Sequence, residues 1–190
     1  MKRQIRVLGI DDSEFTFRDS TVPVVGVVMR APSYIEGVMK TEVRVDGDDA
    51  TDVIGKMVAG SRYRDQLRLI MIDGVTLGGF NIIDIGRLHA CLEIPVATVT
   101  RDKPDMNAIK SALKKHFADW EDRFGLISAG KIEELKVRGF SVYSGYAGIK
   151  RADIVKILGD TTVVGAVPEP VRVAHIIATA LARGESRGRA

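Results

Sequence analysis

Aspartates follow two apolar runs of the chain, at points where a strand would end. Asp11 comes directly after the apolar residues 5–10, and Asp73 comes directly after residues 67–72. The carboxyl ends of neighbouring strands in an open α/β sheet form a common ligand crevice, so Asp11 and Asp73 converge if their strands are adjacent. Four further acids between these two runs offer a third member of a cluster: Asp46, Asp48, Asp49 and Asp52.

Carboxylates held close together favour one kind of chemistry. Each raises the pKa of its neighbour unless a cation lies between them. Oxygen ligands suit a hard divalent ion, Mg²⁺ or Mn²⁺, which lowers the pKa of water and stabilises charge on a phosphate during hydrolysis. Acids after strands also cap helices and form turns, and that structural alternative remains open at this stage.

Other residues at the same sheet edge are candidates for contact with substrate. Gly78 and Gly79 lie in a glycine-rich turn where backbone amides could approach a phosphate, although a simple tight turn explains them equally well. Arg101 follows the next apolar run and is a candidate phosphate ligand. Tyr146 is a possible base contact through stacking, with core packing as the alternative.

The elements that must position these residues begin with three strands. Residues 5–10, 21–29 and 34–45 are rich in β-branched residues or alternate in polarity, and the connections between them are short. Three consecutive strands of this kind predict an antiparallel meander.

After residue 47 the apolar period changes to that of helices alternating with buried strands. Helices are predicted at residues 49–58, 80–92, 104–116, 150–158 and 168–182, and strands at 67–72, 96–99 and 140–143. The interval 118–135 has mixed charge and two glycines, and it is treated as an insertion. The order predicts a ribonuclease H-like mixed sheet, in which the antiparallel three-strand meander is followed by parallel strands, with helices on both faces. A Rossmann domain would instead open with a parallel βαβ unit and a glycine-rich first turn.

Composition is compatible with one domain over residues 1–183 and a polar tail over 184–190. The chain has 190 residues, of which 45% are hydrophobic and 28% charged, and a formal net charge of +3, which permits contact with phosphate without demanding it. The single cysteine, Cys91, excludes an internal disulfide and is expected to be a buried core residue. We find no signal-peptide pattern and no membrane-spanning run, so a cytoplasmic protein that does not engage a membrane is expected.

Four segments, in order, resemble motifs of endonuclease V. They are Ile-Asp-Asp-Ser at residues 10–13, Ile-Met-Ile-Asp-Gly at 70–74, Ile-Pro-Val-Ala-Thr-Val-Thr-Arg at 94–101 and Pro-Glu-Pro-Val-Arg-Val-Ala-His at 168–175. A closer resemblance is to an uncharacterised, mainly archaeal family related to endonuclease V, carried by Val-Asp-Gly-Asp-Asp-Ala-Thr at 45–51 and by residues 73–81.

The resemblance implies a metal site and a substrate class. It places Asp11, Asp73 and Asp49 on the acids that hold Mg²⁺ (or Mn²⁺) in the nuclease, with aspartate at position 49 where the nuclease has glutamate. It places Arg101 on the active-site lysine. Nucleic acid, DNA or RNA, is the implied partner.

The chain departs from the nuclease at two points. Ala147 stands where the nuclease motif Gly-His-Arg-Ile has its histidine, and the wedge loop Tyr-Ile-Pro-Gly is matched only loosely by residues 34–37. His175 lies among apolar residues without a paired ligand four positions on, which favours a packed or surface histidine over a metal ligand. Two hypotheses follow, a metal-dependent nuclease and a non-catalytic module that binds nucleic acid or a nucleotide. A hydrolase acting on a small phosphoester is a third.

Overall fold

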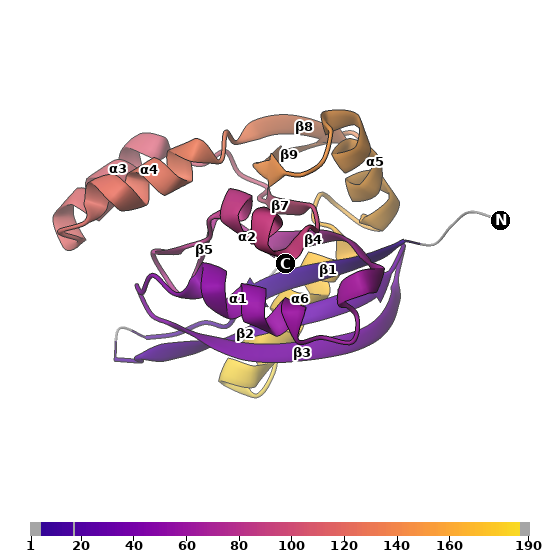
Figure 1. Cartoon of the computed structure of the whole chain (residues 1–190), viewed down its shortest axis with the longest axis horizontal. Helices are drawn as coiled ribbons and strands as arrows, with labels where there is room; N and C mark the ends of the chain where they lie inside the picture. The colour runs from indigo at the N-terminus through magenta and orange to yellow at the C-terminus, as the bar shows by residue number, and fades with distance from the viewer. Residues whose placement is uncertain (1–4, 17, 187–190) are drawn as a thin grey trace.

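A six-stranded mixed sheet forms the centre of the protein in the computed structural model, which describes residues 5–16 and 18–186 (Figure 1). Starting from the edge strand β10 (Tyr146–Ala147), the strand order is β10-β7-β4-β1-β2-β3. β1 (Arg6–Asp12), β2 (Thr21–Arg30) and β3 (Tyr34–Arg44) pair antiparallel, and β4 (Leu67–Asp73) and β7 (Val96–Val99) continue the sheet in parallel with β1. The predicted meander followed by parallel strands is therefore confirmed.

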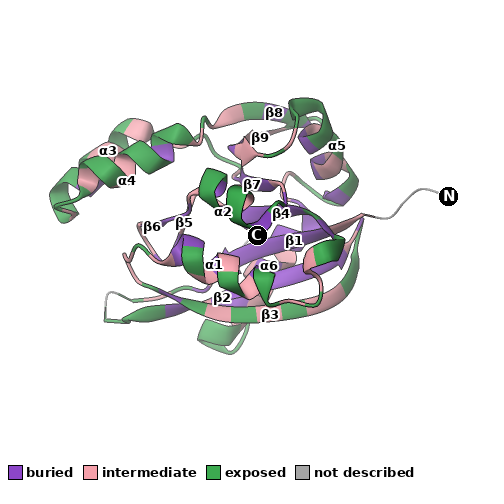
Figure 2. Ribbon diagram, in the orientation of Figure 1, coloured by how far each residue is buried: buried purple, intermediate pink, exposed green. Residues whose placement is uncertain are grey.

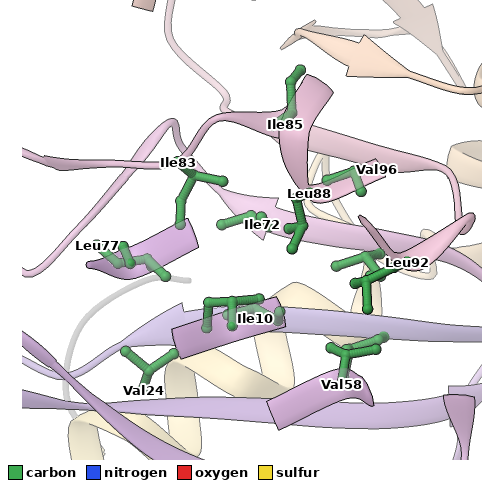
Figure 3. Packing of buried hydrophobic residues seen from close by; sticks show 14 of the residues in the cluster. Ile10, Val24, Val58, Ile72, Leu77, Ile83, Ile85, Leu88, Leu92 and Val96 are labelled. Atoms are coloured by element: carbon green, nitrogen blue, oxygen red, sulfur yellow. The ribbon is translucent and has the colours of Figure 1, made fainter. Parts of the chain in front are cut away.

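Helices cover both faces of this sheet. α1 (Ala50–Ala59) and α2 (Ile85–Leu92) lie on one face, and α6 (Glu169–Arg183) lies on the other, behind the sheet in Figure 1. Side chains of β1 and β4 such as Ile10 and Ile72 pack against Val58 of α1 and Leu88 of α2 (Figure 3). Val7 and Met71 point to the opposite face of the sheet, where they pack against Val171 and Ala174 of α6. Alternation along the strands thus separates the two cores.

The seat of α6 on β1 is unusually close. A Cβ atom at Gly9 would lie 2.1 Å from the backbone carbon of Pro170, so only glycine at this position lets the helix approach the strand. Gly9 lies two residues before Asp11, and Pro170 lies five residues before His175. This contact therefore fixes α6 against the end of the strand that carries the first aspartate.

The interval 118–135, expected as an insertion, contains regular structure. α3 (Met106–His116) and α4 (Trp120–Ala129) form a helical hairpin that extends away from the sheet and is mostly exposed (Figure 2). A small cluster of Leu113, Ile127 and neighbouring aromatic residues holds it together. β8 (Glu133–Val137) then pairs with β9 (Phe140–Ser144) in a separate hairpin, followed by the short β10 (Tyr146–Ala147) and by α5 (Arg151–Thr161).

Two local predictions are wrong. The predicted helix over residues 80–92 begins only at Ile85, because Asn81–Ile82 forms β6, which pairs with β5 (Thr76–Leu77), and Asp84 caps α2 through the Arg87 amide. Cys91 is exposed rather than buried, since its side of α2 faces outward. Within the described residues, no helix is long and apolar enough to cross a bilayer.

Candidate metal centre

Asp11 and Asp73 come together with a histidine at one edge of the sheet. β1 and β4 are adjacent and parallel, so the side chains at their carboxyl ends meet. Asp11 and Val25 are register partners, and Val25 belongs to the core on the α6 side, so Asp11 points towards α6. There the Nδ1 atom of His175 lies 2.8 Å from Oδ2 of Asp11.

Asp11, Asp73 and His175 form a compact set of donors. One potential ligand atom from each residue lies within 4.8 Å of those of the other two. Among the described residues, these three side chains form the group that could hold a metal ion. Asp11 is buried, with 4% of its surface exposed, whereas Asp73 and His175 are half-buried. Three ligand atoms at such spacing from β1, β4 and α6 suit one divalent ion with open positions for water or substrate.

The electrostatics of the group reveal an excess of negative charge. Burial, followed by the charge of Asp11, raises the pKa of Asp73 from 3.8 to about 7, and the nearby positive groups His175 and Arg101 offset only part of this. The hydrogen bond to Asp11 raises the pKa of His175 above its ordinary 6.5, against the effect of its partial burial. A buried acid whose pKa is raised by a neighbouring carboxylate is stabilised in its charged form by a cation, so the residues present fit a divalent metal.

Asp49 does not belong to this group. Its carboxylate accepts hydrogen bonds from the Asn81 side chain at 2.6 Å and from the Arg44 backbone amide at 3.2 Å, and it forms an ion pair with the Arg44 guanidinium at 3.3 Å. Burial raises the pKa of Asp49, but the hydrogen bonds from Asn81 and Arg44 outweigh it and leave that pKa lowered. Through these contacts Asp49 links the end of β3, the start of α1 and β6.

The glycine-rich turn is likewise occupied by the protein's own carboxylates. The Gly78 amide donates to Asp12 at 2.8 Å, and the Phe80 amide donates to Asp46 at 2.8 Å. A Cβ at Gly79 would lie 2.3 Å from the Asp46 carboxylate. Gly78 and Gly79 therefore wrap the backbone around internal acids, and two of the amides that a phosphate would need already have acceptors.

Two other predicted contacts lie in different places. Arg101 is exposed and lines a pocket of about 210 Å³ together with Asp73 and His175, next to the metal group. Tyr146 lines another pocket, of about 320 Å³, and its hydroxyl donates to Glu133, which also pairs with Arg151. The structure thus brings Arg101 to the acids, while Tyr146 is engaged in a hydrogen bond elsewhere.

Sequence reasoning missed His175 as a member of the site. Its apolar neighbours favoured packing, and Val171 and Ala174 do pack, but the helix turns His175 to the side of Asp11. Ala147, at the position of the nuclease histidine, lies in β10 and packs against the core on the α1 and α2 side. The available signal was the resemblance of residues 168–175 to a nuclease motif, a segment that ends at this histidine.

Comparison of the architecture with solved structures identifies a ribonuclease H-like fold that endonuclease V shares. The catalytic domain of human endonuclease V aligns with a TM-score of 0.62 at 14% identity, covering 96% of this chain and 84% of that one. Ciona intestinalis endonuclease V, in complex with a DNA containing inosine, aligns with a TM-score of 0.56 at 12% identity, over 92% of this chain and 84% of that one. At these identities the likeness shows the fold alone.

The particular family follows from the sequence. Residues 3–182 match the family described as endonuclease dU, and the chain belongs to that family. A UPF0215 protein from Methanothermobacter thermautotrophicus is 48% identical over 192 residues, covering 100% of this chain and 94% of the relative. An Archaeoglobus fulgidus protein of unknown function aligns with a TM-score of 0.84 at 37% identity, over 94% of this chain and 98% of that one. The predicted relation to an archaeal family near endonuclease V is confirmed.

Proposed function

We propose that this protein is a metal-dependent endonuclease that hydrolyses a phosphodiester bond of nucleic acid. The observation that carries the proposal is the convergence of Asp11, Asp73 and His175, whose ligand atoms lie within 4.8 Å of one another. The family description as an endonuclease and the shared fold with endonuclease V support the same reaction class.

Asp11 and Asp73 would hold Mg²⁺ or Mn²⁺ through carboxylate oxygens, and His175 would supply the third donor. Carboxylates suit Mg²⁺ and Mn²⁺, whereas imidazole is a softer ligand, so the mixed set favours Mn²⁺ over Mg²⁺ in affinity. A bound ion of this kind supplies electrostatic stabilisation of charge on the phosphate and lowers the pKa of water. Arg101, on the wall of the same pocket, would bind a phosphate oxygen of the substrate.

His175 also has a role that does not depend on the ion. Its Nδ1 hydrogen-bonds to Asp11, and this contact holds the carboxylate in one orientation at the end of β1. Asp49, which lies outside the group, would fix the start of α1 instead of binding metal.

The test is cleavage of labelled oligonucleotides carrying one deoxyuridine, one deoxyinosine or no modified base, with Mg²⁺ or Mn²⁺. The wild-type protein should cleave a modified strand, and Asp11→Asn and Asp73→Asn should each lower the rate by at least about 10³-fold. Asp52→Asn is the matched control, because Asp52 is an exposed aspartate paired with Arg87 on the helix surface. Equal cleavage by wild type and both site variants would overturn the proposal.

The second candidate is a module that binds nucleic acid without cutting it, and Ala147 at the position of the nuclease histidine motivates it. Titration calorimetry with the same oligonucleotides separates the two functions. Binding by the wild-type protein without any product in the cleavage assay would establish the module and exclude the nuclease.

A further inference from the structure

The first turn of α6 places an arginine beside the proposed metal ligands Asp73 and His175. Arg172 lies three residues before His175, one helical turn away on the same side of α6. It lines the pocket of about 210 Å³ together with Asp73, Arg101 and His175. A cationic group therefore stands on the wall of the cavity in which the substrate phosphate would lie.

This arginine is held in a fixed orientation by a buried carboxylate. Arg172 Nε donates to Glu169 Oε1 at 2.9 Å, and Nη2 donates to Glu169 Oε2 at 2.6 Å. Only 9% of the Glu169 side chain is exposed, whereas 36% of Arg172 is exposed. An ordinary pair at this helical spacing consists of two solvated side chains, so the burial of one partner distinguishes this pair.

The two-point contact with Glu169 leaves further hydrogen-bond donors on the Arg172 guanidinium. A guanidinium has five N–H groups in one plane, and the two-point contact with Glu169 uses two of them. The other three, on Nη1 and Nη2, point away from that carboxylate. A planar set of donors with a fixed direction matches two oxygens of a phosphate, which a lysine at the same place could not do.

The charges along the pocket explain why such a group is needed. Asp73 on the inner wall repels an incoming phosphate, whereas Arg101 and Arg172 on the same pocket attract it. We propose that Arg172 binds a non-bridging oxygen of the substrate phosphate directly, and that Glu169 is the positioning residue that aims its guanidinium into the pocket. This inference rests on the proposed function for its reaction, but the contact itself is with a phosphate group.

The kinetic test compares Arg172→Ala, Arg172→Lys and Glu169→Gln in the oligonucleotide assay. Removal of one such donor should lower kcat/KM by about 100-fold in Arg172→Ala, and lysine should restore only part of the loss. Glu169→Gln keeps the positive charge of Arg172 but weakens the contact that orients its guanidinium, so kcat should fall by about tenfold while KM stays unchanged. Arg183→Ala is the matched control, because Arg183 is on the same helix and paired with Glu14, outside the pocket. Unchanged kinetics in Arg172→Ala would overturn the proposal.

A second readout does not require cleavage. Thymidine 5′-monophosphate serves as the phosphate probe, titrated into the protein with Mn²⁺ and followed by calorimetry and by ³¹P relaxation. Arg172→Ala should weaken nucleotide binding by at least about tenfold, while Mn²⁺ affinity and the melting temperature match those of Arg183→Ala. Equal nucleotide binding by wild type and Arg172→Ala, or none by the wild type, contradicts the proposal. A wild-type protein that binds the nucleotide but never cleaves DNA would refute the nuclease function and leave the role of Arg172 intact.

Discussion

Aspartates on the two faces of one sheet edge behave differently in this protein. The α6-side acids, Asp11 and Asp73, face a histidine and each other, and burial with the charge of Asp11 holds the pKa of Asp73 near 7. The α1-side acids, Asp12, Asp46 and Asp49, accept hydrogen bonds from Gly78, Phe80, Asn81 and Arg44. Asp11 and Asp12 are neighbours on β1 and point to opposite faces.

The difference shows that residue type alone does not decide which acid is a candidate metal ligand. Backbone and side-chain donors leave the pKa of Asp49 lowered, whereas burial raises the pKa of Asp12 to about 6 and the Gly78 amide offsets only part of that rise. A carboxylate placed against a second one has an unbalanced charge, which a divalent cation can neutralise. The α6-side acids are therefore the candidates for chemistry, and the α1-side acids hold the loops.

The strongest test of the difference between the two faces is to neutralise Asp11 and Asp12 separately. Asp11→Asn should weaken Mn²⁺ binding by more than about 100-fold, because it removes a charged ligand. Asp12→Asn keeps an oxygen for the Gly78 amide and should leave the Mn²⁺ affinity within about threefold of wild type. Calorimetric titration of both variants gives the answer, and similar losses in the two would erase the distinction between the faces.

The pH dependence of metal binding is the next largest effect. Below about pH 7 the Asp73 carboxyl carries a proton, and the raised pKa of His175 adds a second competitor. Because up to two protons compete with the ion, Mn²⁺ affinity should rise by about tenfold or more per pH unit between pH 5.5 and 7 and less steeply above that range. Titrations at several pH values measure this directly, and a flat profile would show that binding of the ion displaces no proton from Asp73.

The stability of the metal-free protein should show the cost of the α6-side charge. The pKa of Asp73 is higher in the folded chain than its ordinary 3.8, so the folded state binds the proton more tightly. Stability is thus lost as the pH rises from about 4 through about 7. Asp73→Asn cannot ionise, and at pH 8 without metal it should be more stable than wild type by on the order of 2 kcal/mol.

Urea unfolding at pH 5 and pH 8, with chelator present, tests this prediction. The gap between Asp73→Asn and wild type should shrink at the lower pH and also on addition of Mn²⁺ to the wild type. A variant less stable than wild type at pH 8 would mean that the ionised Asp73 is well accommodated without a cation.

The smallest expected effect concerns Asp49, an α1-side acid. Asp49→Ala removes the acceptor for Asn81 and Arg44, and it should lower stability by about 1 kcal/mol without changing Mn²⁺ affinity. Asp49→Asn retains an acceptor oxygen and should lose less. Chemical denaturation measures the stability of the two variants, and metal titration measures their Mn²⁺ affinity. A loss of Mn²⁺ affinity in Asp49→Asn would show that Asp49 is a metal ligand.

Much of the fold could be predicted because its strands are locally unambiguous. The β-branched run over residues 21–29 and the buried runs before Asp73 and Arg101 match β2, β4 and β7 closely. The helix predicted over residues 104–116 forms α3, whereas α4 escaped prediction because its cluster with Leu113, Ile127 and aromatic residues is small and the helix is mostly exposed, which weakens the apolar period. α2 was predicted too long because the pairing of Asn81–Ile82 with Thr76–Leu77 is a tertiary feature.

The site was predictable only in part. Asp11 and Asp73 are signalled by their place after adjacent parallel strands, which is a rule about chain direction. His175 and Asp49 are not, because their roles depend on which way a helix turns and on which donors a loop supplies. Such partners lie far apart in the sequence and leave no periodic trace.

The separation of His175 from Asp11 by 164 positions also bears on how the protein is made. A nascent chain emerging from the ribosome acquires both carboxylates long before the histidine and the helix that carries it. Until α6 docks on Gly9, the growing polypeptide has an incomplete set of donors and a long stretch of uncovered β1 and β2. Docking of α6 would therefore both cover this face of the sheet and complete the proposed set of metal ligands.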